Sequence, residues 1–463
     1  HRAGFFGART FRFNLRALIQ EMLQKHDGAM PLKGIGQALL SHTEQRLGGP
    51  RLAVPVLVPE DLREHPDYLK FLERDGEGEH AHLRAWLVDR LSLEVVFEYG
   101  FRVRSGRSLE KTGCSTVIVD QEALGKAAAD LALMVSEDEF LESRREPLGE
   151  SEAEHFLAGL INRLRLRGGV HQSLLESYVR DSGKRYMLSR KMNPLGPIFG
   201  KEAVLPRFLL ETPPRKGKRS AFDAYTSDAG NLTWYRDWAA RCLGIDPDDS
   251  GLVELYRTAV RRLEESGILQ SVATNAPATQ QASGVSQAAL TIVDGAQEVA
   301  CPVCKEIIRL PNGVAERWSG RPCTKYRCTG MWGESKDAPD TFYTRIFREG
   351  RIARVFPEEH TGLLERQKRE GIEEAFKERE RPNLLVCTPT LEMGIDIGDL
   401  SAVMLCSVPP TTSAYLQRIG RAGRKTGNAL CLTIANARPH DLYFHADPPA
   451  MMQGEVDPPG CFL

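Results

Sequence analysis

Residues 417–424 read Q-R-I-G-R-A-G-R and say more about the fold than any other stretch of this 463-residue sequence. An apolar run at residues 402–408 precedes them, so we expect a buried strand and then a helix that begins near Thr412. On that helix Arg421 and Arg424 stand at i and i+3 and share one face. Two arginines on a helix usually form a solvated face. Here the glycines beside them let another surface approach, which favours a site for a multiply charged phosphate.

A second informative segment comes earlier in the chain. The apolar strand pattern Leu384–Cys387 is followed by residues 388–399, which read T-P-T-L-E-M-G-I-D-I-G-D. In open α/β sheets, loops at the carboxyl ends of strands bind ligands. Threonine hydroxyls and exposed amides can hold phosphate there, and an aspartate can accept a hydrogen bond from a sugar hydroxyl. Strand and helix patterns alternate from about residue 340 to 436, which predicts an α/β domain with a parallel sheet.

A third segment, residues 360–364 (H-T-G-L-L), leads into a charged helix that we expect to end near Glu380. On that helix Glu373 and Lys377 stand at i and i+4, so we expect them to support each other. We read this segment together with the two segments above.

These segments resemble the motifs of superfamily 2 helicases of the DEAD/DEAH type. Residues 388–399 resemble motif V, residues 417–424 resemble motif VI, and residues 360–364 resemble the His-Gly-x-Leu turn that precedes motif V. The likeness is closest to the Lhr-like and phage-defence groups, whose members carry insertions and cysteine clusters. It covers about residues 340–463 and implies a RecA-like helicase C-terminal domain.

The resemblance implies an ATP-dependent helicase or translocase in which two RecA-like domains bind ATP and Mg²⁺ between them and grip nucleic acid. DNA is expected rather than RNA through the family likeness alone. Arg421 and Arg424 would be arginine fingers that stabilise charge on the γ-phosphate. The other implied site residues are Gly394, Asp396 and Gln417 for ATP, and Thr388, Thr361 and Gly362 for the nucleic-acid backbone.

The other half of an ATP site is missing from the sequence. No G-K-S or G-K-T occurs, since Gly217-Lys218 is followed by Arg219, and no D-E-A-D or D-E-x-H box is present. Without them the chain cannot assemble a complete hydrolytic site. We therefore expect an inactive fragment whose partner RecA-like domain lies upstream of His1. The alternative is a non-hydrolysing nucleic-acid-binding scaffold with a degenerate RecA-like fold. The intact arginine pair argues against this alternative, because a protein that does not hydrolyse ATP has no need of it.

Four cysteines form a separate pattern. Cys301 and Cys304 are followed by Cys323 and Cys328, a C-x2-C and a C-x4-C pair with 18 residues between them. Zinc accepts four thiolates in a tetrahedron, and four protein ligands leave no open position, so we expect a structural zinc ion. Basic and aromatic residues at 321 and 325–327 crowd the second pair. They either contact a nucleic-acid backbone or are solvated.

The remaining sequence predicts a mostly helical insertion before the zinc module. Leu252–Glu265 is its best helix pattern, and a strand pattern at residues 268–272 follows, which suits a winged helix or a plain packing unit. Residues 273–287, rich in Ala, Thr, Ser and Gln, predict a linker. The expected parts are a mixed α/β inter-motor region at 1–150, a helical region at 151–272, a linker and four-cysteine zinc module at 273–335, and the RecA-like domain at 336–463.

The first strand of the RecA-like domain has no clear place in the sequence. One candidate is residues 116–135, which would make the helical and zinc modules insertions within that domain. The preferred interpretation is that the N-terminal RecA-like domain lies upstream of His1, and the place of this strand stays open.

Composition sets broad limits. The chain is 41% hydrophobic and 27% charged, as in a soluble globular protein, and it is long enough for about three packed units. Its net charge of −1 excludes a uniformly basic protein, so any nucleic-acid surface is a local patch. No apolar run approaches the roughly 18–20 residues of a membrane span, and no signal peptide is visible. The six scattered cysteines suit free thiols in a reducing compartment, so we expect a cytoplasmic protein.

Overall fold

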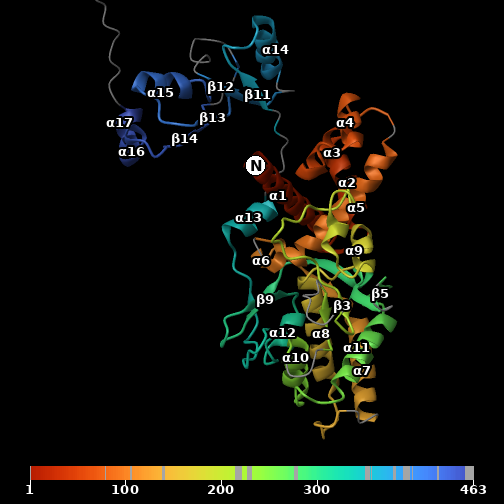
Figure 1. Cartoon of the computed structure of the whole chain (residues 1–463). Coiled ribbons are helices and arrows are strands. Elements are labelled where there is room, and N and C mark those ends of the chain that lie inside the picture. Colours follow the sequence, from red (N-terminus) through yellow and green to blue (C-terminus); the bar gives the residue numbers. More distant parts are fainter. Residues whose placement is uncertain are drawn as a thin grey trace, which may run out of the picture. The chain divides into compact units, whose positions relative to one another are not determined.

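The computed structural model describes residues 2–78, 80–104, 107–137, 141–213, 222–226, 232–275, 280–349, 355, 357–378, 382–388, 397–398, 400–424 and 427–453. The chain forms two compact units, His1–Ile352 and Ala353–Leu463 (Figure 1). Among the described residues, no helix has both the length and the apolar character needed to cross a membrane. The expected division into four parts stays a prediction beside these two units.

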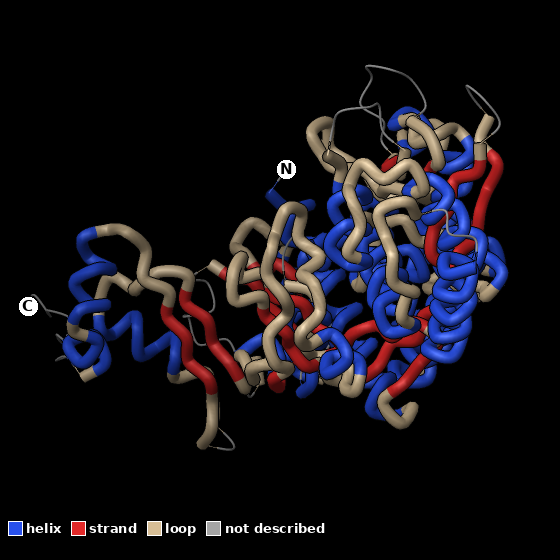
Figure 2. Tube along the Cα trace, turned by 90° about the horizontal axis from the view of Figure 1, so that it is seen from below, coloured by secondary structure: helices blue, strands red, loops and turns tan. Residues whose placement is uncertain are grey.

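Helices and loops form most of the first unit, with short strands between them (Figure 2). Its long helices bury leucines such as Leu18, Leu39 and Leu91, each 0% exposed. The helices are α1 (Arg2–Lys25), α2 (Ile35–Leu47), α3 (Pro50–Leu57), α4 (Pro66–Glu73), α5 (Ala81–Glu98), α6 (Leu109–Thr112), α7 (Gln121–Glu137), α8 (Glu150–Leu166), α9 (Glu176–Arg180), α10 (Trp234–Leu243), α11 (Leu252–Glu265), α12 (Val314–Trp318) and α13 (Phe342–Glu349). Short 3-10 turns are η1 (Glu60–Leu62), η2 (Phe101–Arg104), η3 (Ser173–Leu175), η4 (Arg185–Leu188) and η5 (Gln287–Ala289).

Three small sheets complete the first unit. Their strands run in the orders β1-β7-β2, β4-β3-β6-β5 and β10-β8-β9. All of their pairings are antiparallel except that of β3 with β4. The strands are β1 (Ala29–Pro31), β2 (Ser115–Val119), β3 (Leu209–Leu210), β4 (Asp223–Ala224), β5 (Leu269–Ala273), β6 (Gln281–Val285), β7 (Leu290–Asp294), β8 (Gln297–Ala300), β9 (Ile307–Leu310) and β10 (Lys336–Asp337).

The linker expected at residues 273–287 is wrong over much of its length. Strand β6 lies there and pairs with both β5 and β3. Its small residues serve packing, because a Cβ atom at Gly284 would meet the Phe208 ring at 2.7 Å. A composition typical of linkers therefore also marks a strand that lies close under an aromatic ring. The hairpin after α11 has the element order that a winged helix requires, and its contact with nucleic acid stays a prediction.

The candidate first strand of the RecA-like domain at residues 116–135 is also wrong. Strand β2 is hydrogen-bonded to β7 in an antiparallel register, with Val117 opposite Ile292. Helix α7, which follows β2, packs against α8. Both elements therefore belong to the core of the first unit, and the first strand of a parallel sheet lies elsewhere.

Helices α8 and α10 form the platform on which the cysteine cluster rests. They approach closely because residue 159 is glycine, where a Cβ atom would lie 2.1 Å from the Trp238 ring. Trp238 is fully buried, and its indole nitrogen donates to the carbonyl oxygen of Phe156 at 3.1 Å. A bulkier residue at 159 would force the two helices apart.

The second unit is a small α/β arrangement. Strand β11 (Pro357–His360) runs parallel to β12 (Leu384–Cys387), and β13 (Ala402–Leu405) runs parallel to β14 (Leu430–Thr433). Its described helices are α14 (Arg366–Lys377), α15 (Thr412–Ile419), α16 (Pro439–Ala446) and α17 (Pro448–Met452). A core of Leu405, Val408, Tyr415 and Met451 joins β13 to the helices. The parallel pairing expected from the sequence is confirmed, but the described strands form two separate pairs.

Candidate metal and nucleotide sites

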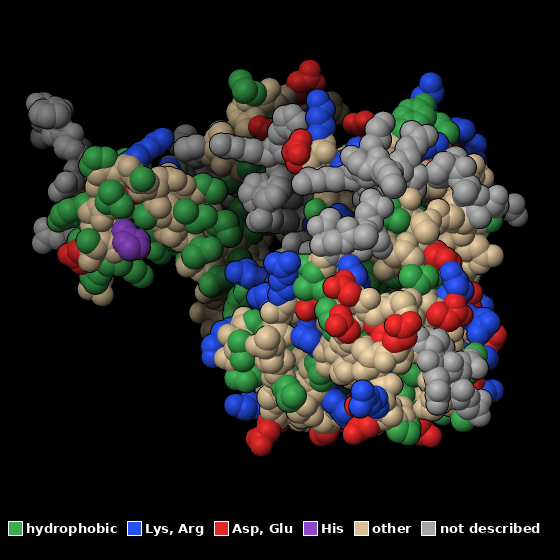
Figure 3. All heavy atoms as spheres, turned by 60° about the horizontal axis from the view of Figure 1, so that its bottom comes forward, with side chains coloured by type: hydrophobic (Ala, Val, Ile, Leu, Met, Phe, Trp, Pro, Cys, Tyr) green, Lys and Arg blue, Asp and Glu red, His purple; other side chains and the backbone are tan. Residues whose placement is uncertain are grey.

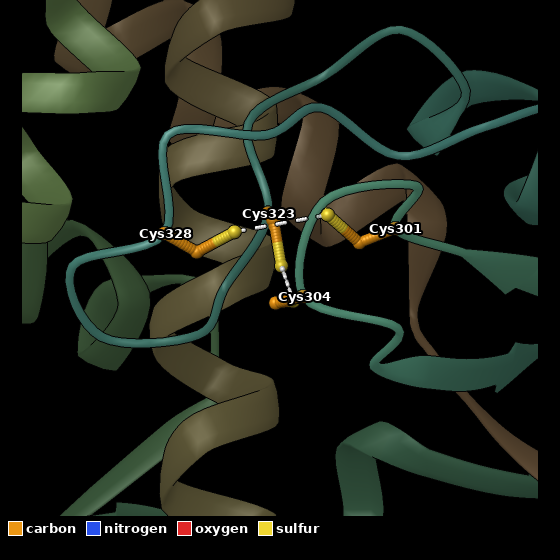
Figure 4. A group of neighbouring side chains, drawn as sticks. All are labelled: Cys301, Cys304, Cys323 and Cys328. Carbon is orange, nitrogen blue, oxygen red and sulfur yellow. Dashed lines mark hydrogen bonds between the residues drawn. The ribbon is translucent and has the colours of Figure 1, made fainter.

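The four cysteines of the C-x2-C and C-x4-C pairs come together in the first unit (Figure 4). All four sulfur atoms lie within 4.8 Å of one another. The Sγ atoms of Cys301 and Cys328 are 3.7 Å apart, as are those of Cys304 and Cys323. These separations are too long for disulfides. Four sulfurs placed about 2.3 Å from a tetrahedral zinc ion are about 3.8 Å apart, so the cluster has the dimensions of a zinc site.

Backbone groups around the cluster point at the sulfurs. Lys325 N–H donates to Cys323 Sγ at 3.5 Å, and Gly330 N–H donates to Cys328 Sγ at 3.4 Å. Burial raises the pKa of the Cys301 thiol, but hydrogen bonds from the backbone of Cys304 and Val303 outweigh it and lower that pKa to about 7. Backbone hydrogen bonds of this kind favour the thiolate, the form in which cysteine binds a metal, but at Cys304 and Cys323 burial outweighs them and raises the thiol pKa.

Two backbone features shape the turns that hold the sulfurs. Lys305 and Arg327 both have φ of 59°, a left-handed conformation that is uncommon for side-chain-bearing residues. Gly330 packs directly on the cluster, where a Cβ atom would lie 2.6 Å from Cys301 Sγ. The cysteine spacing alone did not reveal this glycine, because its role depends on how closely the two turns meet.

Side chains from α8 and α10 hold the second cysteine turn in place. His155 bonds through Nε2 to the carbonyl oxygen of Pro322 at 3.0 Å, and Trp234 Nε1 donates to that of Thr324 at 2.8 Å. Arg241 donates to the carbonyl oxygen of Cys323. Burial lowers the pKa of His155 to about 4, so the ring is neutral at physiological pH. The cluster is therefore built into the helical core.

The basic and aromatic residues beside the second cysteine pair make contacts within the unit. Arg321 bonds to Ser151, and the hydroxyl of Tyr326 donates to the carbonyl oxygen of Leu232. The Arg327 guanidinium lies 5.1 Å from the centre of the Tyr326 ring. These contacts tie the turn to neighbouring segments, a role that neither sequence alternative described.

In the second unit, Arg421 and Arg424 do not lie on a helix, although the sequence predicted that they do. Helix α15 ends at Ile419 with Gly420 as its C-cap, and Gly423 has φ of +68°. The N–H of Gly423 donates to the carbonyl oxygen of Leu400 at 2.9 Å. The two glycines therefore end the helix, and Arg421 and Arg424 lie in the loop that follows it, beside β13.

A cavity of about 780 Å³ lies within the second unit. Its walls include β12 and β13, and its lining contains Thr388, Arg418 and Arg421. Thr388 follows the last residue of β12, so the cavity reaches the carboxyl end of that strand. The structure thus brings together one predicted nucleic-acid contact and one predicted arginine finger. Arg418 also lines this cavity, and the sequence motifs did not predict it as a site residue.

The remaining predicted residues lie in different places. Gln417 is on α15. Thr361 and Gly362 follow β11. Gly394 and Asp396 lie outside the described residues.

The turn at Thr361 is anchored by a buried pair. His360 is 0% exposed, and its Nε2 lies 2.7 Å from Oε1 of Glu373 on α14. Glu373 therefore contacts His360, a partner that the sequence did not predict. Its support of Lys377 stays a prediction. This pair fixes β11 to α14 and so sets the start of the Thr361 turn.

Residues 337–426 match the family model described as helicase conserved C-terminal domain. Druantia protein DruE from Escherichia coli is 32% identical over 128 residues, which are 25% of this chain and 7% of DruE. ATP-dependent helicase HRQ1 from Saccharomyces cerevisiae is 38% identical over 69 residues, 15% of this chain and 6% of HRQ1. The chain thus aligns with less than a tenth of the length of these relatives.

A solved structure, the DUF1998 helicase MrfA bound to DNA and AMPPNP, is 27% identical over 24% of this chain and 16% of that chain, with a TM-score of 0.21. The similarity found in all of these comparisons is confined to about a quarter of the chain or less. The family-model match over residues 337–426 confirms the RecA-like helicase C-terminal region expected from residues 360–364, 388–399 and 417–424.

Proposed function

Because residues 337–426 are a superfamily 2 helicase C-terminal region, we propose that this chain is half of an ATP-dependent helicase or translocase motor. Arg421 and Arg424 act as arginine fingers on an ATP whose phosphates and Mg²⁺ are held mainly by an upstream RecA-like domain of the same protein. The chain has no G-K-S or G-K-T segment, so it does not hydrolyse ATP by itself.

The observation that carries this proposal is the shared cavity of Thr388 and Arg421. A threonine at the end of β12 and an arginine after α15 are far apart in sequence, yet both line one space beside two strands. Ligands of open α/β sheets bind at such strand ends. An arginine there suits a phosphate group, because its guanidinium can form two parallel hydrogen bonds to phosphate oxygens.

The nucleic-acid partner is DNA in this proposal. Thr388, Thr361 and Gly362 contact phosphates of the backbone, which position the strand but carry little sequence information. Phosphate contacts do not separate DNA from RNA, so the preference rests on the family likeness. A role in phage defence stays a prediction from that likeness, and the cytoplasmic location stays a prediction from the scattered free cysteines.

The Cys301, Cys304, Cys323 and Cys328 cluster holds a structural zinc ion in this proposal. The sulfur separations fit the metal, and backbone N–H groups donate to the sulfurs of Cys323 and Cys328. Four cysteine ligands leave no position for water or substrate. The ion therefore stabilises the fold of residues around β8 and β9 rather than taking part in ATP hydrolysis.

The experiment is an ATPase assay of the longer natural protein that contains this chain, with and without single-stranded DNA or RNA. We expect DNA-stimulated turnover that Arg421→Ala lowers by about 10³-fold. Arg366→Ala is the matched control, because Arg366 is exposed and pairs with Glu370 on its own helix. Intact nucleic-acid binding without any turnover in the unmodified protein would favour the non-hydrolysing scaffold instead.

A further inference from the structure

Three arginines of the first unit converge on one carboxylate. Each donates a hydrogen bond to Asp223 at 3.0–3.2 Å, and the three are Arg163, Arg167 and Arg207. The hydroxyl of Tyr235 also donates to Asp223, at 3.2 Å. In the part of the chain that the structure describes, Asp223 is the only acidic side chain that forms an ion pair with any of these arginines. The arginine group, as we call these three residues, therefore carries two positive charges more than its carboxylate neutralises.

The backbone holds the arginine group together. Arg163 lies in the last turn of α8, and Arg167 is the C-cap of that helix. Arg207 lies just before β3, and its N–H donates to the carbonyl oxygen of Arg167 at 2.9 Å. The two segments approach this closely because residue 169 is glycine, where a Cβ atom would lie 2.4 Å from the carbonyl oxygen of Arg207. The Arg163 guanidinium lies 4.2 Å from the centre of the Trp234 ring. The positions of the three side chains are thus fixed in advance of any ligand.

The guanidinium groups keep donors that Asp223 does not use. Each arginine contacts Asp223 through a single nitrogen, which is Nη2 in Arg163 and Nη1 in Arg167 and Arg207. Among the described residues, the buried Nε of Arg163 has no hydrogen-bond partner. The side chains of Arg167 and Arg207 are 24% and 36% exposed, so solvent reaches the group. A ligand from solution can therefore bind to the remaining N–H groups.

The positive charges of the group are poorly compensated. Burial raises the pKa of Asp223, but the three arginines outweigh it and lower that pKa, so the carboxylate is ionised. Burial and the neighbouring Arg163 lower the pKa of Arg167 to about 10, although Asp223 opposes them. Cations that are partly removed from water and close to one another are stabilised by a further anion. The group therefore favours an anionic ligand.

We propose that the arginine group binds one phosphomonoester, the terminal phosphate of a nucleic-acid strand. A phosphomonoester carries about two negative charges at neutral pH, which matches the excess charge of the group. An internal phosphodiester carries only one. The planar guanidinium also suits this ligand, because it donates two parallel hydrogen bonds to phosphate oxygens.

The arrangement of charge favours a strand end over the middle of a strand. Grooves that bind a nucleic-acid backbone distribute cations along it, since each nucleotide brings one phosphate. Here the three arginines meet at a single carboxylate. On the face of the first unit seen in Figure 3, Lys and Arg side chains lie among Asp and Glu side chains, so the charge of that face is mixed. The choice of nucleic acid over another phosphorylated molecule rests on the proposed function.

The test compares strand ends. The longer natural protein, without ATP, is titrated with fluorescent oligo-dT strands of about ten nucleotides that carry a phosphate or a hydroxyl at the unlabelled end, 5′ or 3′. We expect a phosphate at one of the two ends to tighten binding about tenfold or more, as charge-assisted hydrogen bonds do. Arg207→Gln should abolish this preference. Arg180→Gln is the matched control, because Arg180 is exposed and pairs with Glu176 on its own helix.

Asp223→Asn separates ligand binding from a purely structural role. The asparagine oxygen still accepts hydrogen bonds from the arginines, but the competing negative charge is gone. We therefore expect the preference for the phosphorylated end to increase several-fold, while a group that only stabilises the fold would show no preference in either protein. Circular dichroism establishes that each variant is folded.

Three results would overturn the proposal. The first is equal affinity for phosphate and hydroxyl at both ends, which would leave the proposed function intact if DNA-stimulated ATPase is normal. The second is a preference that persists in folded Arg207→Gln. The third is displacement of the phosphorylated strand by an equal concentration of thymidine monophosphate or of a phosphoserine peptide, which would assign the group to a free nucleotide or to a phosphopeptide. A preference that depends on Arg207 in a protein without ATPase activity would support this site and count against the motor.

Discussion

Arg424 donates a hydrogen bond from Nε to the carbonyl oxygen of Gly420, the C-cap of α15, at 2.9 Å. This bond satisfies one of the carbonyl groups that a helix end leaves without an internal partner. Arg424 is exposed, so the bond contributes only about 0.5–1.5 kcal/mol. Binding of a phosphate can replace it at little cost. A single exposed hydrogen bond therefore holds the Arg424 guanidinium near the end of the helix.

Gly423 sets the direction of Arg424, and its replacement tests this role. Gly423→Ala places a Cβ atom 3.2 Å from Ala429 and Asn428 at a φ of +68°, so we expect the loop to shift and DNA-stimulated ATPase of the longer protein to fall at least tenfold. Gly427→Ala is the matched control, because Gly427 has φ of +71° but no atom within 4 Å of an added Cβ. Equal turnover in both variants would show that Gly423 does not set the direction of Arg424.

The zinc proposal predicts one zinc ion per chain, measured by inductively coupled plasma mass spectrometry. Cys323→Ser should abolish that zinc and lower the thermal unfolding temperature, since metal binding to such clusters contributes about 10–16 kcal/mol in isolated zinc peptides. Cys431→Ser, which replaces an exposed cysteine outside the cluster, should retain the metal. A protein that contains no zinc when purified without chelator, and takes up none when it is added, would contradict the assignment.

Because His155 is buried, we expect the folded protein to lose stability in mild acid. Its folded pKa is lowered to about 4 by burial, below the usual value near 6.5, so protonation favours the unfolded chain. The stability is fully present above about pH 6.5 and is lost as pH falls toward about 4, by about 3 kcal/mol in all. His155→Gln can still donate to Pro322 and does not titrate. Denaturant unfolding at about pH 7.5 and about pH 5 should therefore show a smaller decrease in the free energy of unfolding for this variant. An equal decrease in both proteins would show that His155 is not the source of the acid sensitivity.

The sequence predicts elements well where apolar periodicity decides them. Leu252–Glu265 and Leu384–Cys387 have the bounds that were expected, because each buries or pairs one regular pattern. Cysteine spacing likewise predicts the cluster at residues 301–328, since four thiols at such separations have one shared use.

The errors arise where distant contacts decide. Glycines at 420 and 423 look compatible with a continuing helix, but a hydrogen bond to Leu400 makes them its end. Glu373 also contacts buried His360, a partner that the helical spacing did not indicate. The small residues of β6 resemble a linker until Phe208 packs against them. In each case the deciding partner lies more than ten residues away, where local pattern carries no information.

The most direct test of the motor assignment is single-turnover ATP hydrolysis by the longer natural protein carrying Arg424→Ala, measured beside its affinity for ATP and for single-stranded DNA. We expect the rate to fall by about 10³-fold or more, because an arginine finger acts mainly on the transition state, and both affinities to change less than about tenfold. Arg366→Ala should match the unmodified protein. Unchanged single-turnover hydrolysis in Arg424→Ala would contradict the central claim that Arg424 is a finger for the bound ATP.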